Sequence, residues 1–210
     1  MKNLRGLYLV TPDWDDTDRL LEVSASALTG GVALLQYRHK TAGDVLRRSQ
    51  AIALQALCRR HGCPFIINDH IDLALDIDAD GVHVGGTDAP VATVRARIGA
   101  DKILGASCYG DLALARSAHA GGASYVAYGG FYPSRVKKYP VTTPVTILAE
   151  SHAAVSLPTV VIGGMTPENC APLVTAGADM VAAISSVYLA PDPRAAAEAF
   201  ARLFSLQGIG

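Results

Sequence analysis

The chain has 210 residues, of which 50% are hydrophobic and 18% charged, and its formal net charge at pH 7 is −1. A chain of this size can bury a large core, so we expect one domain spanning residues 1–210. The small net charge and positive mean hydropathy exclude an intrinsically disordered chain and a basic nucleic-acid-binding surface. No apolar stretch approaches the ~18 residues of a membrane span and no signal peptide is recognisable, which predicts a cytoplasmic protein without a membrane partner.

The four cysteines are spaced unlike those of a disulfide framework or a structural zinc site. Cys58, Cys63, Cys108 and Cys170 contain no CxxC pair. We therefore expect reduced thiols that act as small hydrophobic side chains.

Short apolar runs recur along the chain, and each ends in Gly, Ser, Thr, Asn or Arg. Runs of this length predict buried parallel strands. In chain order they are residues 6–11, 33–38, 64–68, 81–85, 103–107, 125–130, 159–164 and 180–185. Helical spacing between them predicts helices over 45–57, 91–98 and 112–120, a helix that begins at Thr166-Pro167 and a last helix that begins near Asp192.

Eight strands that alternate with helices in about 200 residues predict an α/β fold, a (β/α)8 TIM barrel. A doubly wound open sheet is the alternative. Such a sheet normally carries a GxGxxG turn after its first strand, where this chain reads Val10-Thr-Pro-Asp-Trp14. The barrel is therefore the favoured fold, and its site is expected at the carboxyl ends of the strands.

The second predicted strand ends in two cations and an amide. Because side chains alternate along a strand, Gln36, Arg38 and Lys40 share one face, and Tyr37 and His39 share the other. Two cations facing one barrel mouth would repel each other without an anion, which predicts a phosphate or pyrophosphate site. A solvated strand end is the simpler alternative.

Acidic residues follow the next two strands. Asn68 and Asp69 end the third strand, and Asp88 lies in the loop after the fourth. Carboxylates at neighbouring strand ends beside cations indicate a Mg²⁺ held together with substrate phosphate oxygens. The alternative is that Asp69 and Asp88 each cap a helix.

Glycines and small polar residues end the last two strands. Gly163-Gly164 follows the seventh strand and Ile184-Ser185 the eighth, at the usual phosphate position of the fold. A tight turn without a ligand is the alternative. The basic, proline-flanked loop over residues 132–140 is long enough to be a lid, unless it is only a solvated charged loop.

Two further residues have structural interpretations. His83 points into the barrel, where a hydrogen-bonded core histidine is commoner than a catalyst. Cys108 has no evident histidine partner, so we expect it to be inert and its neighbour Ser107 to be the ligand contact.

Nearly the whole chain resembles the thiamine-phosphate synthase (thiamine-phosphate pyrophosphorylase) family. The segments that carry the resemblance are LYLVTPD, LLQYRHK, FIINDHIDLALDIDADGVHVGGTD, ILGASCY, YVAYGGFYPSRVKK and TVVIGGMTPENCAPLVTAGADMVAAISSVY. The resemblance implies a TIM-barrel transferase that joins a hydroxymethylpyrimidine diphosphate to a thiazole phosphate, which is carboxylated or not, and releases pyrophosphate. It implies small-molecule substrates and Mg²⁺, and it leaves a homo-oligomer open.

The resemblance also implies a role for each matching residue. Its pyrimidine and diphosphate contacts match Gln36, Arg38, Lys40, Asn68 and Ser107; its loop contacts match Ser134 and Lys137; its thiazole-phosphate contacts match Gly164, Ile184 and Ser185; and its Mg²⁺ ligands match Asp69 and Asp88. Arg38, Lys40, Lys137 and Ser107 are the expected catalytic residues.

The chain departs from the family pattern at two positions. Val136 stands where the family usually has a threonine, and Gly86 stands where it commonly has a glutamine. Two other functions stay open: a thiazole tautomerase of the same superfamily, which is an isomerase without metal or pyrophosphate release, and a non-catalytic protein that binds a phosphorylated ligand.

Overall fold

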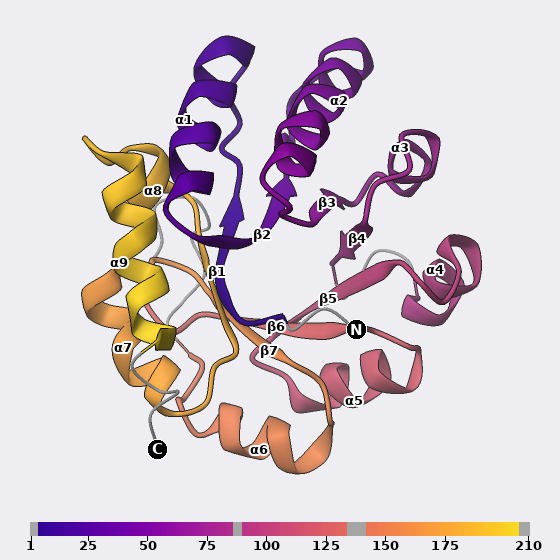
Figure 1. The fold of residues 1–210 in the computed structure, drawn as a ribbon. Helices are drawn as coiled ribbons and strands as arrows, with labels where there is room; N and C mark the ends of the chain where they lie inside the picture. The colour runs from indigo at the N-terminus through magenta and orange to yellow at the C-terminus, as the bar shows by residue number, and fades with distance from the viewer. Residues whose placement is uncertain (1–3, 86–89, 134–141, 206–210) are drawn as a thin grey trace.

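A computed structural model describes residues 4–85, 90–133 and 142–205 of the chain. These residues form strands that alternate with helices, and the helices surround the strands as an outer ring (Figure 1). The strands are β1 (Gly6–Val10), β2 (Val32–Tyr37), β3 (Phe65–Asn68), β4 (Gly81–Val84), β5 (Ile103–Tyr109), β6 (Tyr125–Gly129), β7 (Thr159–Ile162) and β8 (Met180–Ala183). The helices are α1 (Thr17–Thr29), α2 (Asp44–Arg60), α3 (Ile71–Asp76), α4 (Val91–Ile98), α5 (Leu112–Ala120), α6 (Ile147–Ala154), α7 (Pro167–Thr175), α8 (Ser185–Tyr188) and α9 (Pro193–Ser205).

The strands close into a parallel barrel in the order β1 to β8. Each strand pairs with the next along the chain, and the barrel is closed where β1 pairs with β8, with Gly6 opposite Met180 and Leu9 opposite Ala183. The predicted (β/α)8 barrel is therefore confirmed, and the open-sheet alternative is wrong. Closure brings the carboxyl ends of all these strands to one mouth.

The core has two parts because side chains alternate along each strand. Tyr8 and Val10 of β1 point into the barrel, where they pack with side chains such as Leu34 and Met180. Leu7 and Leu9 alternate with them and pack in the larger layer between barrel and helices. The interior of the barrel is thus filled by side chains, which leaves its mouth as the place for a ligand site.

Three local features differ from the sequence-based expectations. β2 ends at Tyr37, so Arg38 lies just past the strand, and β5 continues to Tyr109 through a register irregularity after Ser107. A short helix that the apolar periodicity did not predict, α8, begins directly after β8. All three features lie at the barrel mouth.

Two other predictions, the cap of α7 and the unpaired cysteines, are confirmed. Thr166 caps α7: its side chain accepts from the backbone N–H of Asn169, whose own side chain accepts from the backbone N–H of Thr166. All four cysteines are buried and free. Within the described residues, no helix is both long and apolar enough to cross a membrane.

Candidate active site

Arg38 and Lys40 lie in the segment that follows β2, and both are ion-paired within the protein. The Arg38 guanidinium Nη1 lies 3.2 Å from Asp13 Oδ2, and the Lys40 ammonium lies 2.5 Å from Asp69 Oδ2. Carboxylates of the chain therefore balance both cations, so the expectation that they lack a counter-charge without a ligand is wrong, whereas the phosphate or pyrophosphate site stays a prediction. Arg38 and Lys40 are still brought together with Asp69 at the carboxyl ends of β2 and β3, as predicted.

Asp13, in the loop between β1 and α1, holds the segment after β2 in place. Its carboxylate accepts hydrogen bonds from Arg38 Nη1 at 3.2 and 3.3 Å and from the backbone N–H of Lys40 at 2.8 Å. Thr11 Oγ1 accepts from the backbone N–H of Arg38 at 2.8 Å and donates to its carbonyl at 2.9 Å. Backbone and side chain of Arg38 are therefore both positioned by the first loop.

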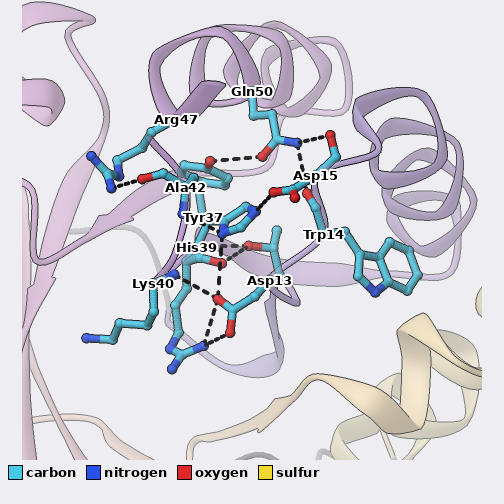
Figure 2. Close-up of polar contacts among 11 residues, drawn as sticks. Asp13, Trp14, Asp15, Tyr37, His39, Lys40, Ala42, Arg47 and Gln50 are labelled. Atoms are coloured by element: carbon cyan, nitrogen blue, oxygen red, sulfur yellow. Dashed lines mark hydrogen bonds and ion pairs between the residues drawn. The ribbon is translucent and has the colours of Figure 1, made fainter. Parts of the chain in front are cut away.

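The opposite face of the same segment is anchored among α1 and α2 (Figure 2). His39 Nδ1 accepts from the backbone N–H of Ala42 at 3.1 Å, so its Nε2–H donates to Asp15 at 3.0 Å. The Tyr37 hydroxyl donates to Gln50 Oε1 at 2.9 Å. The predicted alternation of side chains thus continues past the end of β2, with Tyr37 and His39 facing the helices.

β3 ends at Asn68, and Asp69 follows it in a backbone conformation that is uncommon for residues other than glycine. Asp69 has φ of 61°, in the left-handed region, and its backbone N–H donates to the carbonyl of His83 at 2.9 Å. Asn68 Nδ2 donates to Asp69 Oδ2 at 2.6 Å. The Asp69 side chain does not cap α3, because the capping residue is His70 and it makes no side-chain bond. The helix-cap alternative for Asp69 is therefore wrong.

A cavity of about 930 Å³ opens at the other half of the mouth, over the ends of β5 to β8. Four predicted ligand contacts line it: Ser107, Gly164, Ile184 and Ser185. The predicted contacts on β2 and β3 are absent from its lining, among them Arg38. The described part of the mouth is thus divided into a charged half at β2–β3 and a hollow half at β5–β8.

The turn after β7 fits closely against the segment after β6. Gly163 and Gly164 have φ of 108° and 64°, and a Cβ atom on Gly164 would lie 2.2 Å from the carbonyl oxygen of Pro133. Asn169 Nδ2 donates to the Gly164 carbonyl at 2.8 Å, and the Tyr132 hydroxyl donates to the Asn169 carbonyl at 2.6 Å. Only glycine combines this backbone conformation with this approach.

The start of α8 supplies a polar group that the sequence reasoning missed. Ser186 lines the cavity, and its buried Oγ has no hydrogen-bond partner among the described residues. Buried hydroxyls normally have a partner, so this group is suited to a ligand. Ser186 follows the predicted Ser185, and a second serine at the same helix start was the available signal.

His83 is a hydrogen-bonded core residue, as the structural interpretation predicted. Its Nδ1 lies 2.9 Å from the Tyr125 hydroxyl and its Nε2 lies 2.9 Å from Ser107 Oγ. Inside the barrel the Tyr125 hydroxyl lies 2.6 Å from that of Tyr8, and Gln36 Nε2 donates to the Tyr8 hydroxyl at 2.5 Å. The predicted ligand contacts Gln36 and Ser107 are thus joined through the barrel interior.

Several predicted residues lie outside the described residues: Asp88, Ser134 and Lys137, together with the departures at Gly86 and Val136. Cys108 is described and buried, and burial raises the pKa of its thiol to about 12. Such a thiol stays protonated near neutral pH, which agrees with the expected inert role.

The sequence reasoning also missed Asp13 and Asp15. Both belong to the acidic run that follows β1, Pro12-Asp-Trp-Asp-Asp16, and that run was the available signal. Its pairing with the segment after β2 required the barrel geometry.

The fold and these side chains define a (β/α)8-barrel enzyme with its site at the carboxyl ends of the strands. A family model described as thiamine monophosphate synthase matches residues 7–187. The chain therefore belongs to the thiamine monophosphate synthase family, as its motifs indicated, and it is an enzyme of the transferase class.

Curated relatives match over nearly their whole length. A thiamine-phosphate synthase of Janthinobacterium sp. (strain Marseille) is 70% identical over 203 residues, which cover 97% of this chain and 98% of that protein. A thiamine-phosphate synthase of Bordetella pertussis is 49% identical and covers 98% of this chain and 99% of its own.

Solved structures agree with the fold. A thiamine phosphate pyrophosphorylase from Pyrococcus furiosus superposes with a TM-score of 0.85 at 30% identity, over 99% of this chain and 98% of that chain. A 3-hexulose-6-phosphate synthase superposes with a TM-score of 0.70 at 20% identity, over 94% of this chain and 99% of its own, and it shows the shared barrel alone.

Proposed function

We propose that this chain, as one domain over residues 1–210, joins 4-amino-2-methyl-5-hydroxymethylpyrimidine diphosphate to a thiazole phosphate, or to its carboxylate, giving thiamine phosphate and pyrophosphate. The observation that carries the proposal is the divided mouth of a barrel of this family. A charged half at β2–β3 suits the diphosphate, and the 930 Å³ cavity at β5–β8 suits the second, ring-bearing phosphate ester.

The charged half is proposed to bind the leaving diphosphate. Arg38 and Lys40 are already positioned there by Asp13 and Asp69, and Lys137 is proposed to join them from the loop after β6. Cations placed where negative charge accumulates stabilise the transition state more than the ground state. A bound diphosphate would also replace Asp13 and Asp69 as the negatively charged partner of Arg38 and Lys40. Both cations would therefore have a counter-charge with and without the ligand.

A divalent cation fits the residues at this edge of the mouth. Asp69 offers a carboxylate oxygen, the ligand type that Mg²⁺ prefers, beside the cations that would hold a diphosphate. We propose Asp69 and Asp88 as the residues that hold Mg²⁺. When bound, Mg²⁺ would supply positive charge to the leaving diphosphate.

The reaction needs orientation more than a protein nucleophile. The electron-rich aminopyrimidine stabilises a cation at its exocyclic carbon, so the C–O bond breaks and its electron pair leaves with the pyrophosphate. The thiazole nitrogen then donates its lone pair to form the C–N bond. Holding both rings in line supplies much of the rate.

The remaining contacts are proposed to orient the two rings. Gln36, Asn68 and Ser107 would contact the pyrimidine side, and Ser134 the substrates from the loop after β6. The backbone at Gly164 and Ile184, together with Ser185, would hold the thiazole phosphate at the cavity. Ser186, whose buried Oγ has no partner among the described residues, is proposed as a further donor there.

Release of pyrophosphate from the two substrates tests this function. The proposed enzyme releases it only when both substrates and Mg²⁺ are present, whereas a thiazole tautomerase or a non-catalytic binding protein releases none. Absence of pyrophosphate under these conditions would overturn the proposal.

A matched pair of variants tests the metal assignment. Asp69→Asn should lower turnover at least 100-fold, equivalent to roughly 3 kcal/mol of transition-state stabilisation. Asp72→Asn is the control, because Asp72 forms an exposed ion pair with Arg97 on the helix surface. Full activity in excess chelator would contradict a role for Mg²⁺.

A further inference from the structure

A continuous chain of hydrogen bonds crosses the barrel interior from β2 to β5. It runs through Gln36, Tyr8, Tyr125, His83 and Ser107, and we call it the interior relay. Its four links measure 2.5, 2.6, 2.9 and 2.9 Å. Tyr8 and Tyr125 are at most 1% exposed, so water does not compete for their hydroxyls. One end of the relay, Ser107, lines the cavity.

The relay has one direction, because a tyrosine hydroxyl carries a single hydrogen. Gln36 Nε2 donates to the Tyr8 oxygen, and the buried Tyr8 hydroxyl hydrogen needs an acceptor, which the Tyr125 oxygen supplies, so Tyr8 donates to Tyr125. The Tyr125 hydroxyl then donates to His83 Nδ1. Burial raises the pKa of both tyrosines well above its usual value, so both keep their hydrogens.

The positions of the hydrogens on His83 and Ser107 follow from this direction of donation. A neutral imidazole whose Nδ1 accepts carries its hydrogen on Nε2, and that hydrogen is donated to Ser107 Oγ. Ser107 Oγ is thereby an acceptor within the protein, and its own hydrogen is available to a ligand in the cavity. At the other end, an amide whose Nε2 donates to Tyr8 offers Oε1 as an acceptor.

The barrel interior is shaped to accommodate the relay. A Cβ atom on Gly105 of β5 would lie 2.1 Å from the Tyr125 hydroxyl and 2.5 Å from His83 Nδ1. The His83 and Tyr125 rings stack at 5.7 Å, and the Tyr8 and Tyr125 rings meet edge to face at 5.7 Å. Glycine at position 105 therefore leaves room for the central link, and ring packing fixes its geometry.

We propose that the interior relay determines recognition of the pyrimidine: Tyr8, Tyr125 and His83 are positioning residues that hold Ser107 as a donor and Gln36 as an acceptor. The proposal rests on the proposed function in one respect, that Gln36 and Ser107 contact the pyrimidine substrate. An aminopyrimidine has ring nitrogens that accept and an exocyclic amine that donates, which complements this pair. An oxopyrimidine presents a carbonyl and a ring N–H instead, so the relay disfavours it.

Discrimination between the two pyrimidines is the main test. Calorimetric titration with the 4-amino pyrimidine diphosphate and its 4-oxo analogue should show the wild type binding the amino compound at least tenfold more tightly. Tyr125→Phe should reduce that ratio at least fivefold, because the tautomer of His83 loses its support. A variant that weakens both ligands equally, with an unchanged ratio, would overturn the proposal.

Tyr128→Phe is the matched control for this variant. Tyr128 lies on the same strand and is equally buried, but its hydroxyl donates to Ser151 Oγ in the helix layer at 2.8 Å. It should keep the wild-type ratio even if its melting temperature falls. A similar loss of discrimination in both variants would contradict a specific role for the relay.

Two substitutions at His83 separate donation to Ser107 from packing. The amide nitrogen of glutamine can take the place of Nε2, whereas that of asparagine reaches only the place of Nδ1. His83→Gln should therefore keep most of the discrimination and His83→Asn should lose it. The reverse order, or equal behaviour of the two, would contradict the assignment.

The imidazole nitrogens give a readout that does not require activity. In the ligand-free protein, ¹⁵N spectra should show a hydrogen on Nε2 of His83 and none on Nδ1, and Tyr125→Phe should produce a mixture. A hydrogen on Nδ1 in the wild type would overturn the relay even if pyrophosphate is released. Conversely, the predicted tautomer without pyrophosphate release would refute the proposed function and leave the direction of the relay established.

Discussion

Gly164→Ala probes the contact between the turn after β7 and the segment after β6, and Gly62→Ala supplies a close control. Both glycines have φ of 64°. A Cβ atom on Gly62 meets nothing within 4 Å, whereas one on Gly164 would lie 2.2 Å from the Pro133 carbonyl oxygen. The two variants thus share the backbone strain and differ in the collision.

The expected losses of stability follow from the backbone strain and from the collision with Pro133. Alanine in the left-handed region costs about 1 kcal/mol, which lowers the melting temperature of a protein of this size by roughly 2–4 °C. Overpacking adds about 1–3 kcal/mol at Gly164, so its melting temperature should fall roughly two to four times as far. Differential scanning calorimetry measures both.

The kinetic effect should be confined to one substrate. Gly164 lines the cavity, so displacement of Pro133 should raise KM for the thiazole phosphate about tenfold, equivalent to about 1.4 kcal/mol. KM for the pyrimidine diphosphate should stay unchanged, and Gly62→Ala should alter neither. If Gly164→Ala matched Gly62→Ala in both melting temperature and KM, the reasoning from the close approach would be refuted.

Four further predictions concern the charged half of the mouth, the loop after β6 and the buried thiols. Arg38→Met should weaken the pyrimidine diphosphate at least tenfold and the thiazole phosphate less than twofold in calorimetric titrations; equal losses would show that the diphosphate site is misplaced. Asp13→Asn should raise KM for the pyrimidine diphosphate about tenfold, as expected for loss of one charged hydrogen bond, and unchanged steady-state constants would contradict this. Lys137→Ala should lower kcat as well as kcat/KM, while a raised KM alone would argue against action on the leaving group. Burial raises the pKa of Cys108 and Cys170 to about 12, so only the unfolded chain ionises them as pH rises above about 9; the free energy of unfolding should fall above that pH, and mass spectrometry after iodoacetamide treatment at pH 8 should find both unmodified.

Much of the fold was predictable because apolar periodicity is a local property of the chain. Each predicted strand corresponds to a strand of the barrel, and the inward orientation of His83 followed from alternation alone. The four-residue helix α8 was not predicted, because a single turn is too short to show a helical periodicity.

The hydrogen-bond partners of the site residues were not predictable, because they lie far apart in the sequence. Asp13 and Arg38 are 25 positions apart, and their contact depends on how two loops meet at the mouth. The sequence showed the cations and the acidic run without showing that they pair. Similarly, the link between Gln36 and Tyr8 depends on side chains meeting inside a closed barrel whose β1–β2 register shifts next to Tyr8.

The divided mouth has a consequence for how such an enzyme can change. Of the groups proposed to hold the leaving group, Arg38, Lys40 and Asp69 follow β2 and β3, and Lys137 is the exception that follows β6, whereas the cavity is built by β5 to β8 and the segments that follow them. Mutations that reshape the cavity can therefore alter the acceptor without disturbing activation of the donor. Laboratory evolution toward a new nucleophilic heterocycle should accumulate its changes in the second half of the chain, around the turn at Gly164 and the start of α8, and should leave Arg38, Lys40 and Asp69 in place.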